Sequence, residues 1–113
     1  MSVVSPILND FVRIGNIGTQ IILNMTEVVT GVEQAVDLSS GVSTVTIDIR
    51  KPRGTIVNLA SSVLNPPGTD GKIHHIDSVG IFDRRGRWQA RGIINFSNGN
   101  IFKGSWAGFQ VGQ

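Results

Sequence analysis

The sequence contains no cysteine and no apolar stretch long enough to cross a membrane. The lack of cysteine excludes a disulfide-stapled scaffold and a thiolate metal site, and it leaves the redox compartment open. Residues 1–10 show no basic segment followed by an apolar core, so no secretory signal is predicted. We therefore expect a soluble protein that is made in a cytoplasm and has no membrane partner.

Charge is scarce as well. Only 16% of the residues are charged, and ten Lys and Arg against eight Asp and Glu give a net charge of +2. A surface with so few charges is typical of a subunit that neighbours partly cover. So small an excess of positive charge gives little support to nucleic-acid binding, which we do not expect.

The chain does contain segments in which apolar and polar residues alternate. Its length of 113 residues suits one domain. Its fourteen glycines and four prolines favour strands and turns over helices. The clearest strand is 43–50, where Val45, Ile47 and Ile49 would face inward. Further strands are predicted at 11–14, 19–26, 55–64 and 72–77, with residues 27–43 rich in turns.

The end of the chain, residues 87–111, contains the strongest hairpin signal. Asn98-Gly99 lies between two alternating runs, and both residue types tolerate a positive φ. Both tryptophans and three of the five phenylalanines lie in this region. This hairpin should therefore supply much of the core.

Two registers of this hairpin are possible. A two-residue loop would put the two tryptophans on opposite faces, whereas a three-residue loop with Gly99 as the bulge residue pairs Ile94 with Phe102 and Ala90 with Trp106. We favour the second register because burying a tryptophan stabilises a fold by a few kcal/mol. It places one set of side chains on the inner face: Trp88, Ala90, Ile94, Phe96, Phe102 and Trp106.

The order of these features resembles a known family. The residues that carry the resemblance are Val36 to Ser39, Val45 to Thr55, Gly86 to Arg91, Ile94 to Gly99 and Phe109 to Val111. They are similar to the immunoglobulin-like N-terminal domain of the baseplate upper proteins of tailed bacteriophages, and to related small tail and collar proteins. The resemblance covers residues 16–111.

The resemblance and the strand pattern together predict an all-β fold, an immunoglobulin-like antiparallel β-sandwich of about seven strands. Residues 1–15 would form an N-terminal arm or an edge strand, and residues 16–113 the sandwich domain. The resemblance implies a non-catalytic structural protein of the virion, located in the tail as an assembly or adaptor subunit of the tail tip, baseplate or collar. Its partners would be other phage tail and baseplate proteins.

Two other functions remain open. One is a carbohydrate- or host-surface-binding β-sandwich, which needs an exposed aromatic residue, and Phe82 is the candidate for it. The other is a capsid decoration protein that touches packaged DNA. A chain that starts at Met1 and ends at Gln113 would form a stand-alone adaptor or collar subunit within the favoured interpretation.

No catalytic, cofactor or metal site is predicted. His74 and His75 are adjacent in a strand, so their rings face opposite ways and cannot easily share a metal ion. The aspartates at 48, 70, 77 and 83 show no spacing that would hold two carboxyl groups at a defined separation. We therefore expect no enzyme activity and no cofactor.

Two regions are predicted to make contacts between subunits. The basic cluster of residues 84–91 could contact phosphate, line a subunit interface or form plain surface. The segment 1–11 could form an edge strand of its own sandwich or an arm that adds to a neighbour's sheet edge. Its apolar residues are Val3, Val4, Ile7, Leu8 and Phe11. Because open sheet edges need covering, we predict a homo-oligomer whose interface contains Val4, Ile7, Leu8, Phe11, Arg84, Arg85 and Arg91.

Overall fold

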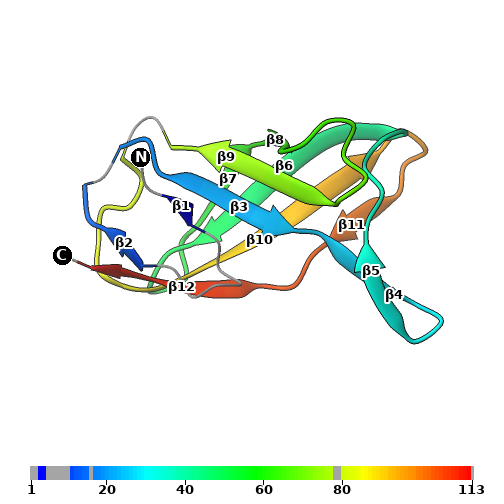
Figure 1. The fold of residues 1–113 in the computed structure, drawn as a ribbon. Coiled ribbons are helices and arrows are strands. Elements are labelled where there is room, and N and C mark those ends of the chain that lie inside the picture. The colour runs from blue at the N-terminus through cyan, green and yellow to red at the C-terminus, as the bar shows by residue number, and fades with distance from the viewer. Residues whose placement is uncertain (1–2, 5–10, 16, 78–79, 113) are drawn as a thin grey trace.

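The computed structural model describes residues 3–4, 11–15, 17–77 and 80–112. These residues form two packed β-sheets and a separate hairpin (Figure 1). The predicted class, an immunoglobulin-like antiparallel β-sandwich, is confirmed. No helix in the described ranges is long and apolar enough to cross a membrane.

The large sheet has six strands in the order β2-β12-β10-β6-β7, with β11 also paired to β10. All its neighbours are antiparallel except β2 and β12, which run parallel. Its long central strands follow directly from the alternating patterns in the sequence. The strands are β2 (Phe11–Arg13), β6 (Val42–Arg50), β7 (Ile56–Ala60), β10 (Gly86–Phe96), β11 (Ile101–Lys103) and β12 (Ala107–Gly112).

The small sheet has four strands in the order β1-β3-β9-β8. They are β1 (Val3–Val4), β3 (Gln20–Asn24), β8 (Ser62–Val63) and β9 (Lys72–Ile76). Since β1 pairs with β3 and β2 pairs with β12, the start of the chain gives one strand to each sheet. The division of the chain at residue 16 stays a prediction.

The core lies between the two sheets and is centred on three aromatic rings. Phe82 and Trp88 have ring centroids 5.3 Å apart, and Phe109 lies 5.9 Å from Phe82. All three are buried, and the Trp88 Nε1–H donates to the Arg84 carbonyl oxygen at 3.0 Å. The prediction that Phe82 is an exposed aromatic for sugar binding is therefore wrong.

The predicted register of the terminal hairpin is correct near the loop and wrong further along. Ile94 does pair with Phe102, but Ala90 pairs with Ala107 and not with Trp106. The Gly104 N–H still donates to the Gly92 carbonyl, so the shift of one residue occurs between Gly104 and Ala107. This bulge turns the Trp106 side chain to the outer face, because a one-residue slip exchanges the faces of a strand.

A hairpin that the sequence pattern did not predict leaves the sandwich after β3. Its strands β4 (Thr26–Val29) and β5 (Val32–Ala35) pair only with each other among the described strands. Thr30 and Gly31, with φ of 49° and 80°, form the tight two-residue loop. Residues 27–43 therefore contain more than turns, and Figure 1 shows the hairpin projecting from one end of the molecule.

The strand predicted at 55–64 is also divided. β7 belongs to the large sheet and β8 to the small sheet, so the chain crosses between the sheets at Ser61. The Ser61 N–H donates to the Val45 carbonyl at 3.0 Å, which holds the crossing point against β6.

Candidate functional site

The outer face of the large sheet carries most of the polar side chains that lie close together. On β10, Trp88 and Ala90 point into the core, so Gln89 and Arg91 point outward. Asp48 on β6 lies opposite Arg91, and Arg50 lies opposite Gln89. We call this surface of β6, β7, β10 and β12, together with Trp106, the outer face.

The Trp106 indole lies against two guanidinium groups of the outer face. The Cζ atom of Arg50 is 4.2 Å from the ring centroid, and that of Arg91 is 4.5 Å from it. Both distances are within the range of a cation–π contact. The bulge at Ser105-Trp106 places the indole here, so the same shift that overturns the predicted core position builds this cluster.

Asp48 holds one of these two arginines in place. Its Oδ2 accepts from Arg91 Nε at 3.3 Å, and its Oδ1 accepts from Asn58 Nδ2 at 2.8 Å. Arg50 has a neutral partner instead, since its Nη1 donates to Gln89 Oε1 at 3.2 Å. Among the described residues no carboxylate pairs with Arg50, so its charge is available on the surface.

Arg87 and Ile56 extend the cluster to either side. Arg87 follows the same alternation as Arg91, and its guanidinium fills the space beside Gly108, where an added Cβ would come within 2.6 Å of Nη2. Ile56 lies directly opposite Arg50 and is 49% exposed. The outer face thus combines an indole, an exposed aliphatic side chain and three arginines against the single carboxylate of Asp48.

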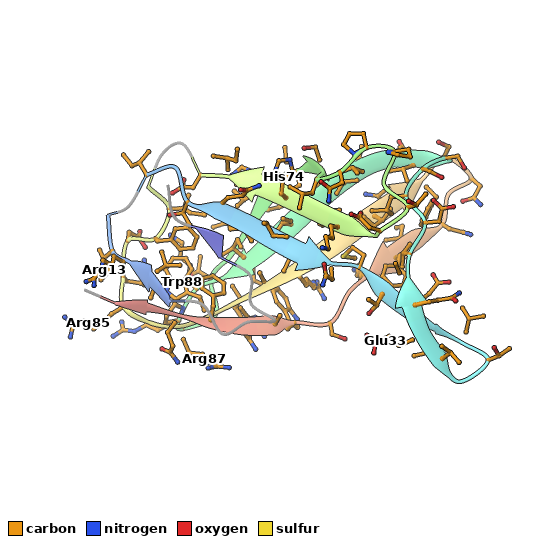
Figure 2. The ribbon with its side chains drawn as sticks, viewed as in Figure 1. Arg13, Glu33, His74, Arg85, Arg87 and Trp88 are labelled. Atoms are coloured by element: carbon orange, nitrogen blue, oxygen red, sulfur yellow. The ribbon has the colours of Figure 1, made fainter. Side chains whose placement is uncertain are left out.

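Charge is distributed unevenly along the molecule, whose longest extent is 41 Å. From residue 14 to residue 49 the chain has four acidic residues and no Lys or Arg. Figure 2 shows Arg13, Arg85 and Arg87 at one end and Glu33, on the β4–β5 hairpin, at the other. One end is therefore basic and the projecting hairpin is acidic.

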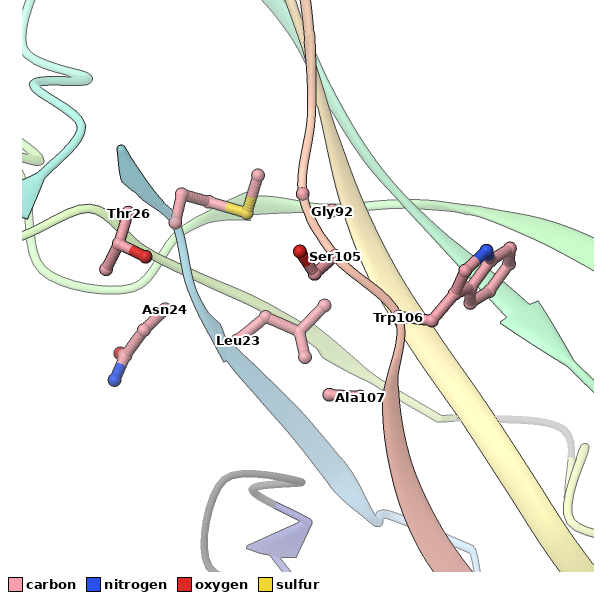
Figure 3. Close-up of a pocket in the computed structure, with 9 residues that line it drawn as sticks. Leu23, Asn24, Thr26, Gly92, Ser105, Trp106 and Ala107 are labelled. Carbon is pink, nitrogen blue, oxygen red and sulfur yellow. The ribbon is translucent and has the colours of Figure 1, made fainter. Parts of the chain in front are cut away.

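A pocket of about 180 Å³ opens beneath the bulge, between the end of β3 and the segment that joins β11 to β12. Gly92 and Gly104 line it and leave room for the Met25 side chain, whose sulfur would collide with a Cβ at Gly92. Figure 3 shows Trp106 and Leu23 on opposite sides of this segment. The pocket therefore lies on the inner side of the segment that carries Trp106, and the residues that line it help to position the Trp106 side chain.

The predicted interface residues fall in different places. Arg91 is the one that the outer face includes. Arg84 and Arg85 lie exposed in the loop before β10, where Arg84 Nε is 3.4 Å from Asp83 Oδ1. Val4 and Phe11 belong to β1 and β2, and their side chains lie outside what the structure describes, as do Ile7 and Leu8 entirely. Their place in an interface stays a prediction.

The aspartates considered in the sequence have separate hydrogen-bond and ion-pair partners. Asp77 is buried and accepts from the N–H groups of Gly80 and Ile81 at 3.1 and 3.2 Å. Asp70 accepts from Asn65 Nδ2 at 2.8 Å and from the Lys72 N–H at 3.1 Å. These hydrogen bonds, that of the Asn65 amide first, hold the pKa of Asp70 below its ordinary value.

The two histidines also have separate partners. His74 Nδ1 lies 2.8 Å from Gln20 Nε2, and His75 Nδ1 lies 2.7 Å from the Ala60 carbonyl oxygen. In the part of the chain that the structure describes, no three His, Cys, Asp or Glu side chains form a group that could hold a metal ion.

Sequence analysis did not identify Arg50, Ile56 or Trp106 as residues of an outer-face site. Arg50 ends the strand predicted at 43–50, but nothing nearby in the sequence marks it as a neighbour of Trp106. The pair forms only because β6 and β10 are adjacent and the bulge reverses one side chain.

Comparison with known proteins gives a likeness of fold. No protein-family model and no curated protein matches this chain. Among solved structures, it is similar to CopC from Methylosinus trichosporium OB3b, with a TM-score of 0.51 and 14% sequence identity over 92% of this chain and 83% of that one. At this identity the likeness shows a shared β-sandwich only.

The prediction of a structural phage virion protein in a tail tip, baseplate or collar is contradicted by this comparison. CopC is among the solved structures that match, and no protein-family model of a phage domain does. The prediction failed for a physical reason. The residues behind it were turns and core positions, which sandwiches of unrelated function share, and such positions identify a fold without identifying a role.

Proposed function

We propose that this protein is a non-catalytic protein-binding module whose outer face holds an acidic segment of a partner. The observation that carries the proposal is the Trp106 indole lying against Arg50 and Arg91 on an accessible sheet surface. Tryptophan and arginine are the residues on which protein interfaces depend most, and an accessible cluster of both is typical of a binding surface.

The chemistry of the cluster favours carboxylates. The planar guanidinium group matches a carboxylate in two parallel hydrogen bonds, and stacking on an indole reduces the freedom that the side chain loses on binding. Asp48 already accepts from Arg91, so Arg50 and Arg87 would carry most of the attraction. The exposed Ile56 and the indole provide apolar contact beside the charges.

A nucleic acid fits the surface less well. Single strands are held by several aromatic rings in succession, and Trp106 is the one aromatic ring identified on the outer face. An acidic peptide needs only a few carboxylates at fixed positions, which suits a cluster of three arginines.

Fluorescence anisotropy with a labelled peptide of alternating glutamate and valine tests the proposal. The wild-type protein should bind this peptide, and the double variant Arg50→Gln/Arg87→Gln should bind it about tenfold or more weakly, because charge pairs at interfaces contribute on this scale. Arg85→Gln is the control, since this arginine is exposed but lies off the outer face.

Two results would refute the proposed function. One is equal peptide affinity for the wild type and the double variant. The other is tighter binding of a labelled DNA oligonucleotide than of the acidic peptide, because that would show a general attraction to polyanions.

A further inference from the structure

Among the described strands, none pairs with the β4–β5 hairpin along its length. Seven of its eight strand residues are exposed, and Glu27 is the half-buried exception. A lone two-stranded hairpin is marginally stable in water, and strands of this kind persist when something packs against them. Among the described residues the hairpin joins the body at its base, where the Met25 N–H donates to the Gly71 carbonyl at 2.7 Å.

The hairpin is also apolar near its tip. Val28 is 71% exposed and Val32 is 59% exposed, and Val29 lies opposite Val32. Exposed valines gathered on one projecting element mark a contact surface better than single apolar residues scattered over a protein. The exposed valines of the hairpin therefore indicate a contact surface.

The charge of the hairpin complements the outer face. Glu27 and Glu33 are its charged residues, and Thr26 Oγ1 donates to Glu33 Oε1 at 2.9 Å, which orients that carboxylate. Because adjacent residues of a strand face opposite ways, Glu33 lies on the face of Val28, and Glu27 lies on the other face with Val29 and Val32. Each face of the hairpin thus presents one carboxylate beside exposed valine. The outer face presents Arg50 and Arg87 beside two apolar groups, the Trp106 indole and Ile56.

We propose that the β4–β5 hairpin of one copy of this chain docks on the outer face of a second copy. This inference rests on the proposed function and names the acidic partner segment as part of the chain itself. The two surfaces are different, so the contact is head to tail, and repeating it produces a ring if the rotation closes or a filament if it does not.

Charge-swapped variants test the contact. Glu27→Lys/Glu33→Lys makes the hairpin basic, and Arg50→Glu/Arg87→Glu makes the outer face acidic, while Arg91 is kept because it neutralises Asp48. Light scattering should show oligomers for the wild type and monomers for each double variant, since like charges across an interface weaken association about tenfold or more. Mixing the two variants should restore association, because each hairpin then meets a face of opposite charge.

Circular dichroism establishes that each variant is folded, and Arg85→Glu is the control for a change of charge elsewhere. A monomeric wild type, or a mixture of the two variants that stays monomeric, would overturn the inference. Binding of the glutamate–valine peptide to the Glu27→Lys/Glu33→Lys variant separates the two proposals. If this variant binds the peptide while the wild type does not self-associate, the proposed function stands and the hairpin contact fails. If the variant does not bind the peptide, the proposed function fails as well.

Discussion

The two tryptophans should respond very differently to replacement by alanine. Trp88 is fully buried among Phe82 and Phe109, and its Nε1–H donates to a backbone carbonyl. Removing a buried aromatic side chain of this kind costs about 3–5 kcal/mol. Trp106 contributes two partly exposed cation–π contacts, each worth about 0.5–1 kcal/mol, so Trp106→Ala should cost about 1–2 kcal/mol.

Urea denaturation followed by circular dichroism measures both values. With about 5 °C per kcal/mol for a domain of this size, Trp106→Ala should lower the melting temperature by about 5–10 °C. Trp88→Ala should lower it by about 15–25 °C. If Trp88→Ala does not fold, Trp88→Phe retains a ring and still loses the hydrogen bond, which should cost about 1–2 kcal/mol.

The fluorescence of each single-tryptophan protein provides an independent check. Emission from Trp88 should be blue-shifted and insensitive to aqueous quenchers, whereas emission from Trp106 should be quenched readily. Equal losses of stability from the two alanine variants, together with two protected indoles, would refute the bulge between β11 and β12. That result would return both rings to the core.

Three further predictions concern packing, the outer face and pH. Gly92→Ala should lower the free energy of unfolding by about 1–3 kcal/mol, because its Cβ would meet the Met25 sulfur, and Met25→Ala in the same chain should recover part of that loss in urea titrations. Asp48→Asn should cost about 1–3 kcal/mol by leaving the half-buried Arg91 without its carboxylate, and that cost should shrink little in high salt. The pKa of Asp70 is lower in the folded state than in the unfolded state, where it is about 4. The ionised Asp70 carboxylate therefore stabilises the fold fully above pH 4, and this stabilisation disappears as the pH falls through the folded-state pKa. In acid titrations, the difference in stability between the wild type and Asp70→Asn should close below about pH 4.

The strands with strict alternation were predictable from the sequence. Residues 43–50 form β6 almost as expected, with Ile47 and Ile49 buried, and Gly99 lies in the predicted loop with a φ of 94°. These features depend on neighbours in the chain, where the period of two decides which side chains face the core.

The site was less predictable because it depends on pairing between distant strands. Arg91 was named from the basic cluster, but Trp106 was assigned to the core, since nothing in Gly104-Ser105 marks the extra residue of the bulge. The β4–β5 hairpin was missed because Thr30-Gly31 resembles an ordinary turn, and its valines are exposed. Alternation of apolar and polar residues identifies a strand by its buried face, so it cannot identify strands whose side chains stay exposed.

The parallel pairing of β2 with β12 has a consequence for how this protein is made. Phe11 lies opposite Gln110, so two segments separated by nearly the whole chain are neighbours in one sheet. On a ribosome, the early segment emerges long before residues 110–112 and has no partner in β12 until they are made. Completion of the large sheet therefore waits for β12, and the high sequence separation of this pairing should make spontaneous refolding slow.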